Sequence, residues 1–113
     1  MELTFVYSPG FVREWNRLRL SDSDLQALEQ SIGRAPESAP VLRGSGGLRK
    51  LRFAPPSMHR GKSSATRVGY AYFRSKDAII VVALFAKSEA PNFTAAERVE
   101  IGKWLKRFER DFK

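Results

Sequence analysis

The sequence predicts a single α+β domain over residues 1–113, in which a small antiparallel sheet of about four strands packs with an N-terminal helical hairpin and a C-terminal amphipathic helix. Three observations predict this class. The chain has 113 residues, enough for one hydrophobic core. Its composition is 42% hydrophobic and 12% aromatic, which is typical of a folded domain. The patterns along the chain follow the order strand, two helices, three strands, helix.

The N-terminal part predicts one strand and two helices. Residues 3–7 have the character of a short strand, which a Pro-Gly pair ends. Apolar residues then recur at helical spacing over residues 11–19. A second helix begins near Ser21, whose hydroxyl can cap free backbone amides, and it ends before Pro36. These two helices form the predicted hairpin.

The middle of the chain predicts three strands, at residues 48–54, 65–73 and 78–86. Residues 75–77 supply the turn between the last two strands. The run from Ala78 to Ala86 is apolar throughout, which indicates a central strand covered on both faces.

The sequence pattern after Thr94 predicts the C-terminal helix. Thr94 and Glu97 have the spacing of a capping box, in which each side chain binds a backbone amide of the other residue. One face of the helix behind it is apolar, with the residues Ile101, Trp104, Leu105, Phe108 and Phe112.

The positive charge is concentrated in residues 38–76. This segment holds nine of the 20 Lys and Arg residues, whereas all 12 Asp and Glu residues lie outside it, and the net charge is +8. Like charges kept together at the cost of self-repulsion usually face a polyanion. The charge therefore indicates nucleic acid, an anionic surface or an acidic protein as a partner.

Several functional classes are excluded or disfavoured by composition. The absence of Cys excludes disulfides, Cys-ligated zinc and a thiol nucleophile, and a single His disfavours a His-based metal site. The longest apolar run is far shorter than a membrane helix, and the first residues lack the pattern of a secretory signal. We therefore expect a cytoplasmic protein with no membrane partner, no cofactor and no metal.

The basic residues of the strands predict a binding face. Alternation places Lys50 and Arg52 on one face of their strand and Arg49 on the other, together with apolar residues. Arg67 lies on the next strand. Two plainer interpretations stay open: Lys50 and Arg52 could simply solvate an exposed face, and Arg67 could form a structural ion pair.

The ordered set of these segments resembles the RelE/HigB family of bacterial toxins. The resemblance covers the order of elements over nearly the whole chain and is most specific between Gly46 and Glu89. It is carried by a capped last helix and four sequence runs, which are GGLRKLRF (46–53), RGK (60–62), TRVGY (66–70) and LFAKSE (84–89).

The resemblance implies a fold and an activity. Members of the family have a small sheet packed on a helical hairpin, and they cleave mRNA without a metal, most of them on the ribosome. A cognate antitoxin protein neutralises them. Such antitoxins often carry a helix-turn-helix domain, through which the complex binds operator DNA. The resemblance therefore implies an endoribonuclease toxin of a type II toxin–antitoxin system, with the antitoxin, mRNA and the ribosome as partners.

The resemblance also assigns catalytic positions. Lys50 and Arg52 match the basic pair of the active-site strand, Arg67 matches the arginine of the next strand, and Lys87 falls near the basic residue that closes the last strand. This chain departs from the family at residues 64–66, where relatives often have glycines, and it has no tyrosine after Tyr72.

Cleavage without a metal proceeds by attack of a 2′-OH on the adjacent phosphate, so negative charge accumulates on the phosphoryl oxygens and fixed cations stabilise it. Guanidinium groups match phosphate geometry, which assigns this role to Arg52 and Arg67. Lys50 and Lys87 would share the role or transfer a proton.

A second set of residues is predicted to bind RNA. Arg60 and Lys62 would contact backbone phosphate. His59 could serve as a general base, or it could simply be solvated in its loop. Arg49 is expected to be partly packed, with RNA contact as a secondary role.

Two other functions stay open. A ParE-like inhibitor of DNA gyrase would share the fold without needing catalytic cations. A non-catalytic nucleic-acid-binding module would use the same basic face for electrostatic attraction alone.

Overall fold

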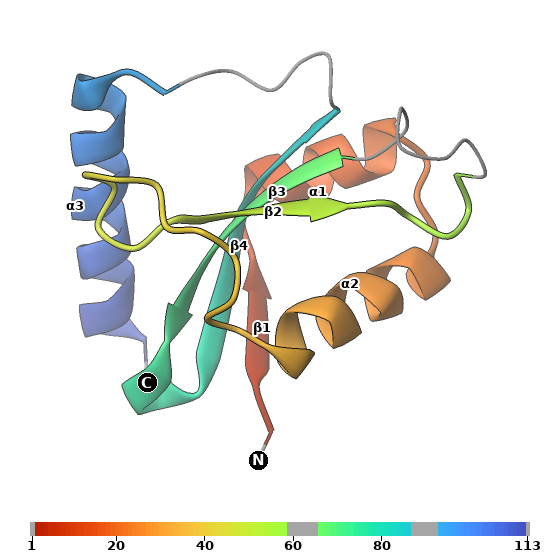
Figure 1. Ribbon diagram of the computed structural model, residues 1–113, viewed down its shortest axis with the longest axis horizontal. Coiled ribbons are helices and arrows are strands. Elements are labelled where there is room, and N and C mark those ends of the chain that lie inside the picture. The colour runs from red at the N-terminus through yellow and green to blue at the C-terminus, as the bar shows by residue number, and fades with distance from the viewer. Residues whose placement is uncertain (1, 59–65, 87–92, 113) are drawn as a thin grey trace.

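The computed structural model describes residues 2–58, 66–86 and 93–112 (Figure 1). Within these ranges the chain forms four strands and three α-helices, with a short 3₁₀ turn at Arg74–Lys76. In chain order the elements are β1 (Thr4–Tyr7), α1 (Pro9–Arg17), α2 (Asp22–Arg34), β2 (Arg49–Phe53), β3 (Thr66–Phe73), β4 (Ala78–Ala86) and α3 (Ala95–Asp111). The predicted α+β class is confirmed.

The strands form one sheet in the order β1-β4-β3-β2. The pairs β2–β3 and β3–β4 are antiparallel, as predicted. The sheet is nevertheless mixed rather than wholly antiparallel, because β1 pairs with β4 in parallel. After β1 the chain forms both helices of the hairpin and then β2, which lies at the opposite edge of the sheet. No tight turn connects β1 to its neighbour β4, so the two strands are not forced to be antiparallel.

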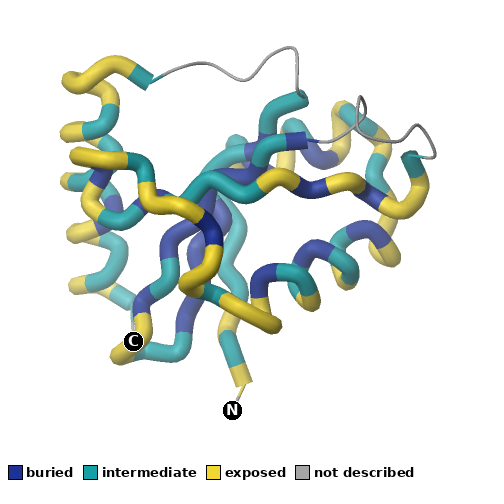
Figure 2. The backbone as a smooth tube through the Cα atoms, in the orientation of Figure 1, coloured by how far each residue is buried: buried dark blue, intermediate teal, exposed yellow. Residues whose placement is uncertain are grey.

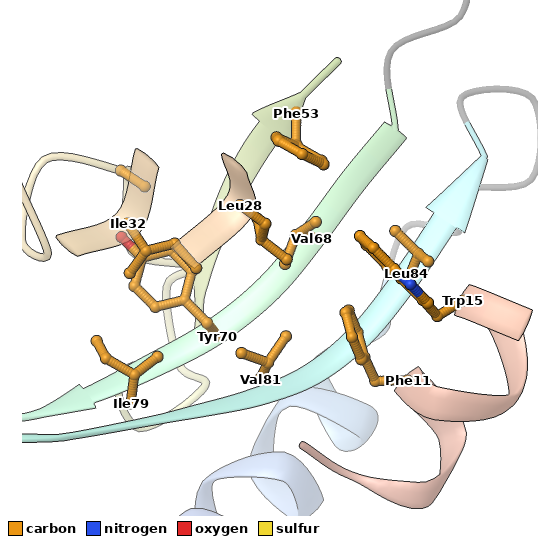
Figure 3. Close-up of a cluster of buried hydrophobic side chains, with 11 residues drawn as sticks. Phe11, Trp15, Leu28, Ile32, Phe53, Val68, Tyr70, Ile79, Val81 and Leu84 are labelled. Atoms are coloured by element: carbon orange, nitrogen blue, oxygen red, sulfur yellow. The ribbon is translucent and has the colours of Figure 1, made fainter. Parts of the chain in front are cut away.

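The helices cover the two faces of the sheet (Figure 1). The hairpin of α1 and α2 packs on one face, where Phe11, Leu28 and Ile32 join strand residues in the larger core cluster (Figure 3). Helix α3 packs on the other face, where Leu105 contacts a second buried cluster. Strand β4 is buried against both layers and appears dark along most of its length in Figure 2. The prediction of a central strand is confirmed.

Each helix begins at a hydroxyl cap. Ser21 and Asp24 form a capping box at α2, and Thr94 and Glu97 form the predicted one at α3. Helix α1 starts at Pro9, two residues before the predicted start, because the Ser8 hydroxyl accepts from the Phe11 amide and proline is well tolerated in the first turn.

A β-bulge in β4 sets which side chains face α3. Tyr70 pairs with Val81 and Gly69 pairs with Ala83, so Val82 is the extra residue. The Ser8 hydroxyl donates to the Val82 carbonyl oxygen at 2.5 Å. Since a bulge shifts the alternation of side chains, the residues after it are re-aimed relative to those before it. This shift occurs next to the basic residues of β2 and β3.

Helix α3 contacts the connecting segments on both sides of it along the sheet. Gly46, with a φ of +73°, lies so close to α3 that a Cβ at this position would be 2.8 Å from the Gly102 Cα. At the other end, the Lys76 ammonium donates to the carbonyls of Glu109 and Phe112. A cation at a helix C-terminus also interacts favourably with the helix dipole.

Candidate functional site

Three of the four predicted catalytic residues share one face of the sheet. Lys50 pairs with Gly69 and Gly69 with Ala83, while Arg52 pairs with Arg67 and Arg67 with Phe85. These two cross-strand rows lie on the α3 side of the sheet, at the end where β2 and β4 finish and β3 begins. We call Lys50, Arg52 and Arg67 the cationic face.

Arg52 and Arg67 are directly opposite one another on neighbouring antiparallel strands. The Cβ atoms of residues in such a pair are about 5 Å apart, and like charges in this position destabilise the sheet. A bound anion between the two guanidinium groups would remove this repulsion. The register therefore places two guanidinium groups where one anion could contact both.

The three residues of the cationic face differ in their exposure to solvent. Arg52 is exposed, whereas Lys50 and Arg67 are partly buried. Neither Lys50 nor Arg67 forms an ion pair with any residue that the structure describes. The Arg67 guanidinium donates only a long bond, 3.4 Å, to the Thr66 carbonyl oxygen. The open alternative of a structural ion pair for Arg67 thus finds no acid among the described residues.

An apolar pocket adjoins these cations. Gly69 forms part of it, and a Cβ at Gly69 would meet Leu48 at 3.5 Å and Ala83 at 3.8 Å, which are ordinary contacts. Phe85 and Phe93 pack edge to face across it, with ring centroids 6.0 Å apart. Such walls exclude water from the stems of the cations, which strengthens their attraction for a bound anion. The pocket is lined by Leu42, Leu48, Arg49, Lys50, Arg67, Val68, Gly69, Ala83, Phe85 and Phe93.

Arg49 lies on the opposite strand face from Lys50 and Arg52. Its guanidinium donates to the carbonyl oxygens of Glu37 at 2.8 Å and Ala39 at 2.7 Å. These bonds hold the segment that follows α2 against the sheet. Arg49 is partly buried, as expected from its apolar neighbours.

Tyr70 is a packed residue beside Arg49. It is 1% exposed, and its hydroxyl donates to the Pro36 carbonyl oxygen at 2.8 Å. Burial raises the pKa of Tyr70 above its ordinary value, while the charge of Arg49 and a backbone hydrogen bond at Ala39 oppose that rise. The hydroxyl therefore stays protonated and serves the core.

The remaining predicted site residues, Lys87, His59, Arg60 and Lys62, lie outside the described residues. Their chain neighbours are nevertheless placed. Ala86, which precedes Lys87, pairs with Thr66, and Thr66 precedes Arg67. The chain thus enters both segments from the end of the sheet that carries Arg52 and Arg67.

Sequence reasoning missed a buried carboxylate that holds the start of the β2–β3 loop. Asp24 is fully buried and accepts from the Ser57 amide at 3.0 Å and the Ser57 hydroxyl at 2.6 Å, as well as from Ser21. Burial raises the pKa of Asp24, but the hydrogen bonds from Ser21 and Ser57 together lower it by a larger amount. The pKa of Asp24 therefore lies below its ordinary value. The sequence pattern at Ser21 predicts a helix start, but it gives no sign of the contact between Asp24 and Ser57.

Among the described residues, no cluster of three or more His, Cys, Asp or Glu side chains could hold a metal ion. None of the described helices has the length and apolar character to cross a membrane.

Comparison with known proteins places the fold. No protein-family model matches the chain. A mutant of the E. coli toxin RelE in the free state superposes with a TM-score of 0.54 at 18% identity, over 99% of this chain and 100% of that one. The isolated E. coli RelE toxin gives 0.53 at 17% identity, over 95% and 99%. The intact E. coli RelBE toxin–antitoxin complex gives 0.52 at 18% identity, over 80% and 100%.

These superpositions span nearly the full length of both chains for the isolated toxin. With 99% of this chain covered, the matched part includes the helical hairpin, the four-stranded sheet and the C-terminal helix. The chain has the fold of the RelE toxin.

Proposed function

We propose that this protein is the toxin of a type II toxin–antitoxin system and that it cleaves mRNA on the ribosome. The observation that carries the proposal is the cross-strand pair of Arg52 and Arg67, with Lys50 on the same face. A fold can host many functions, so the RelE fold by itself does not give the activity. The proposal therefore depends on the side chains of the cationic face. A phosphodiester is the ligand that this arrangement fits best.

The proposed reaction uses the RNA's own 2′-OH as the nucleophile. A bond forms between this oxygen and the adjacent phosphorus, and the bond from phosphorus to the 5′ oxygen of the next nucleotide breaks. The products are a 2′,3′-cyclic phosphate and a new 5′-OH. A base must take the proton of the 2′-OH, and an acid must supply one to the leaving oxygen.

The guanidinium groups of Arg52 and Arg67 would stabilise the charge that builds up on the non-bridging oxygens. Their two planar forks can each donate two parallel hydrogen bonds to a phosphate. Lys50, two residues from Arg52 on the same strand face, would share this role or carry one of the protons. We propose Lys87 for the same duties, since it directly follows the last residue of β4.

The flanking basic residues would hold the RNA strand. We propose that His59, Arg60 and Lys62 bind its backbone phosphates and that Arg49, already bound to two carbonyls, contributes only secondarily. Such contacts make binding weaker as salt rises, because each one releases counterions from the RNA.

The proposed partner is an antitoxin protein encoded beside this chain. The RelBE structure shows a RelE-fold toxin together with an antitoxin, and the charge of +8 favours an acidic or amphipathic segment that covers the cationic face. We further propose a cytoplasmic location, where ribosomes and mRNA are present, and operator binding through the antitoxin.

Mapping RNA 5′ ends after induction tests the proposed function. Cuts inside translated messages, absent when the neighbouring gene is co-expressed, are the expected result. Intact messages with DNA damage would indicate gyrase inhibition instead. Intact messages and intact DNA, together with salt-sensitive RNA binding in vitro, would leave a binding module as the function.

A further inference from the structure

The outer face of α3 carries a second group of cations, distinct from the cationic face. Lys103, Lys106, Arg107 and Arg110 follow the spacing i, i+3, i+4, i+7, which places them within an arc of about 100° around the helix. All four are exposed, and together they line one shallow depression of the surface. We call these four residues the α3 stripe.

The charges of the α3 stripe are only weakly engaged within the protein. Lys103 pairs with Glu100 at 3.4 Å and Arg110 with Asp111 at 3.1 Å, and all four of these side chains are between 62% and 73% exposed. Ion pairs this exposed contribute little and are readily exchanged for another anion. Lys106 and Arg107 have no hydrogen bond or ion pair to any residue that the structure describes.

The α3 stripe takes no part in the buried packing of the helix. The other side of α3 supplies the packing, with Leu105 buried and Ile101 and Phe108 partly buried against the sheet. Gly102 lies against the 45–46 backbone, and Lys76 binds the last turn of the helix. The inner side of α3 is therefore packed against the protein, and its outer side exposes four cations to solvent.

We propose that the α3 stripe is a second RNA-binding surface, which holds the phosphate backbone of a folded RNA such as a ribosomal helix. The inference rests on the proposed function for the identity of the polyanion. Four cations spread over about 10 Å of helix match consecutive phosphates of one strand. Contacts with phosphate carry no sequence information, so we expect binding without sequence preference.

The position of α3 makes simultaneous contact with the cationic face feasible. The helix lies on the side of the sheet that carries Lys50 and Arg67, and Phe93, just before its start, packs against Phe85, the cross-strand partner of Arg67. The α3 stripe begins about 12 Å along the helix from that end. A large ribonucleoprotein particle can cover this distance while the cationic face holds the scissile phosphate.

The test compares two charge reversals of equal size. The variant Lys106→Glu/Arg107→Glu alters the α3 stripe, and Arg13→Glu/Arg34→Glu alters exposed cations on α1 and α2, beyond the other face of the sheet. Binding of a labelled hairpin of 2′-O-methyl RNA is followed by fluorescence anisotropy over a salt series. This RNA has no free 2′-OH, so binding is read without cleavage.

We expect the α3-stripe variant to bind on the order of tenfold more weakly near 0.1 M salt, and its plot of log K against log salt to be shallower by about 1.5, as for two lost phosphate contacts. The α1–α2 variant should keep the wild-type slope. Equal losses in both variants would overturn the inference, as would wild-type binding by the α3-stripe variant. Tighter binding of poly-glutamate or of phosphatidylglycerol vesicles than of RNA would overturn it in favour of another partner.

The same variants separate this inference from the proposed function. If the wild type cleaves no message but the α3-stripe variant loses RNA affinity, the proposed function fails and the second surface stands. If messages are cut and the α3-stripe variant binds the hairpin as the wild type does, only the second surface fails.

Discussion

Arg49 on β2 and Arg67 on β3 lie on neighbouring strands of the same sheet, yet the groups around the two side chains differ. On the side of the helical hairpin, Arg49 donates two short hydrogen bonds to backbone carbonyls. On the α3 side, Arg67 faces another arginine and makes one long bond to a carbonyl. The first arginine satisfies acceptors that the fold creates, whereas the second lies opposite a like charge on the neighbouring strand.

The same contrast holds for the polar groups around each arginine. Tyr7 donates to Glu29, Tyr70 to Pro36 and Ser57 to Asp24, all on the hairpin side. Among the described residues, every buried side-chain N or O atom has a hydrogen-bond partner. These side chains on the hairpin side therefore hold neighbouring elements together, whereas Lys50 and Arg67 on the α3 side form no ion pair with a described residue.

The largest expected difference between the two sides is in activity. Arg67→Ala should slow cleavage of mRNA on ribosomes by about 10² to 10³-fold, as for the loss of one fixed donor to a developing oxyanion. Arg49→Ala should change the rate by less than about tenfold once the folded fraction is matched, because its side chain is used on the other face. Single-turnover cleavage with purified ribosomes measures both rates. Equal losses would mean that the cationic face is not the reaction site.

The next effect in size is on stability at the buried carboxylate. Asp24→Ala removes the charged acceptor of the Ser57 amide and hydroxyl and of the Ser21 amide, so the free energy of unfolding should fall by about 3 kcal/mol. Asp22→Ala is the matched control, since Asp22 is an exposed acid in the same helical turn and should cost about 0.5 kcal/mol. Urea denaturation measures both changes, and similar values for the two would show that the Ser57 contact contributes nothing.

Arg49→Gln should lower the free energy of unfolding by about 2 kcal/mol, because two hydrogen bonds from a charged donor are lost. The loss should appear in urea denaturation with an unchanged m-value, since the exposed surface on unfolding stays the same. A stability equal to that of the wild type would mean that the carbonyls of Glu37 and Ala39 are equally well satisfied by water.

The pH dependence of stability should carry the signature of Asp24. Its pKa is lower in the folded protein than in the unfolded chain, so its contribution is fully present above the ordinary aspartate pKa near about 4 and is lost as the pH falls through the folded value. The Asp24→Asn variant should lack this part of the decline. The effect should be smaller than that of Asp24→Ala, because a protonated carboxyl still fills its site. Thermal melts between pH 7 and pH 3 for both proteins, compared at matched ionic strength, measure it, and parallel curves would contradict it.

The elements whose limits depend on local signals were predictable from the sequence. The capping box at Thr94 fixed the start of α3, and the apolar run gave β4 its observed bounds, Ala78–Ala86. The same apolar run concealed the bulge at Val82, because a strand without polar residues shows no change of face. The parallel pairing of β1 with β4 was equally hidden, since it depends on the path of the chain across the sheet.

The candidate site was predictable only in part. Alternation placed Lys50 and Arg52 on one face, but the opposition of Arg52 and Arg67 is a matter of register, which local patterns do not specify. The contacts of Arg49 and Asp24 were missed because their partners are backbone groups and a serine far along the chain. The contact of Gly46 with Gly102 was missed because the two residues are far apart in the chain. Taken alone, Gly46 resembles an ordinary loop glycine, and Gly102 resembles a residue that weakens a helix.

The smallest expected effect has the opposite sign on the two sides of the sheet. Arg67→Gln keeps most of the side-chain stem in the apolar pocket but removes one of two opposed charges, so the free energy of unfolding should rise by about 0.5 kcal/mol at low salt. The gain should shrink as salt is added, because screening already weakens the repulsion in the wild type. Arg49→Gln loses stability at every salt concentration. Urea denaturation of the two variants at about 0.02 and 0.5 M salt measures this comparison. A loss of stability for Arg67→Gln that does not depend on salt would show that Arg67 stabilises the fold, and it would contradict the prediction.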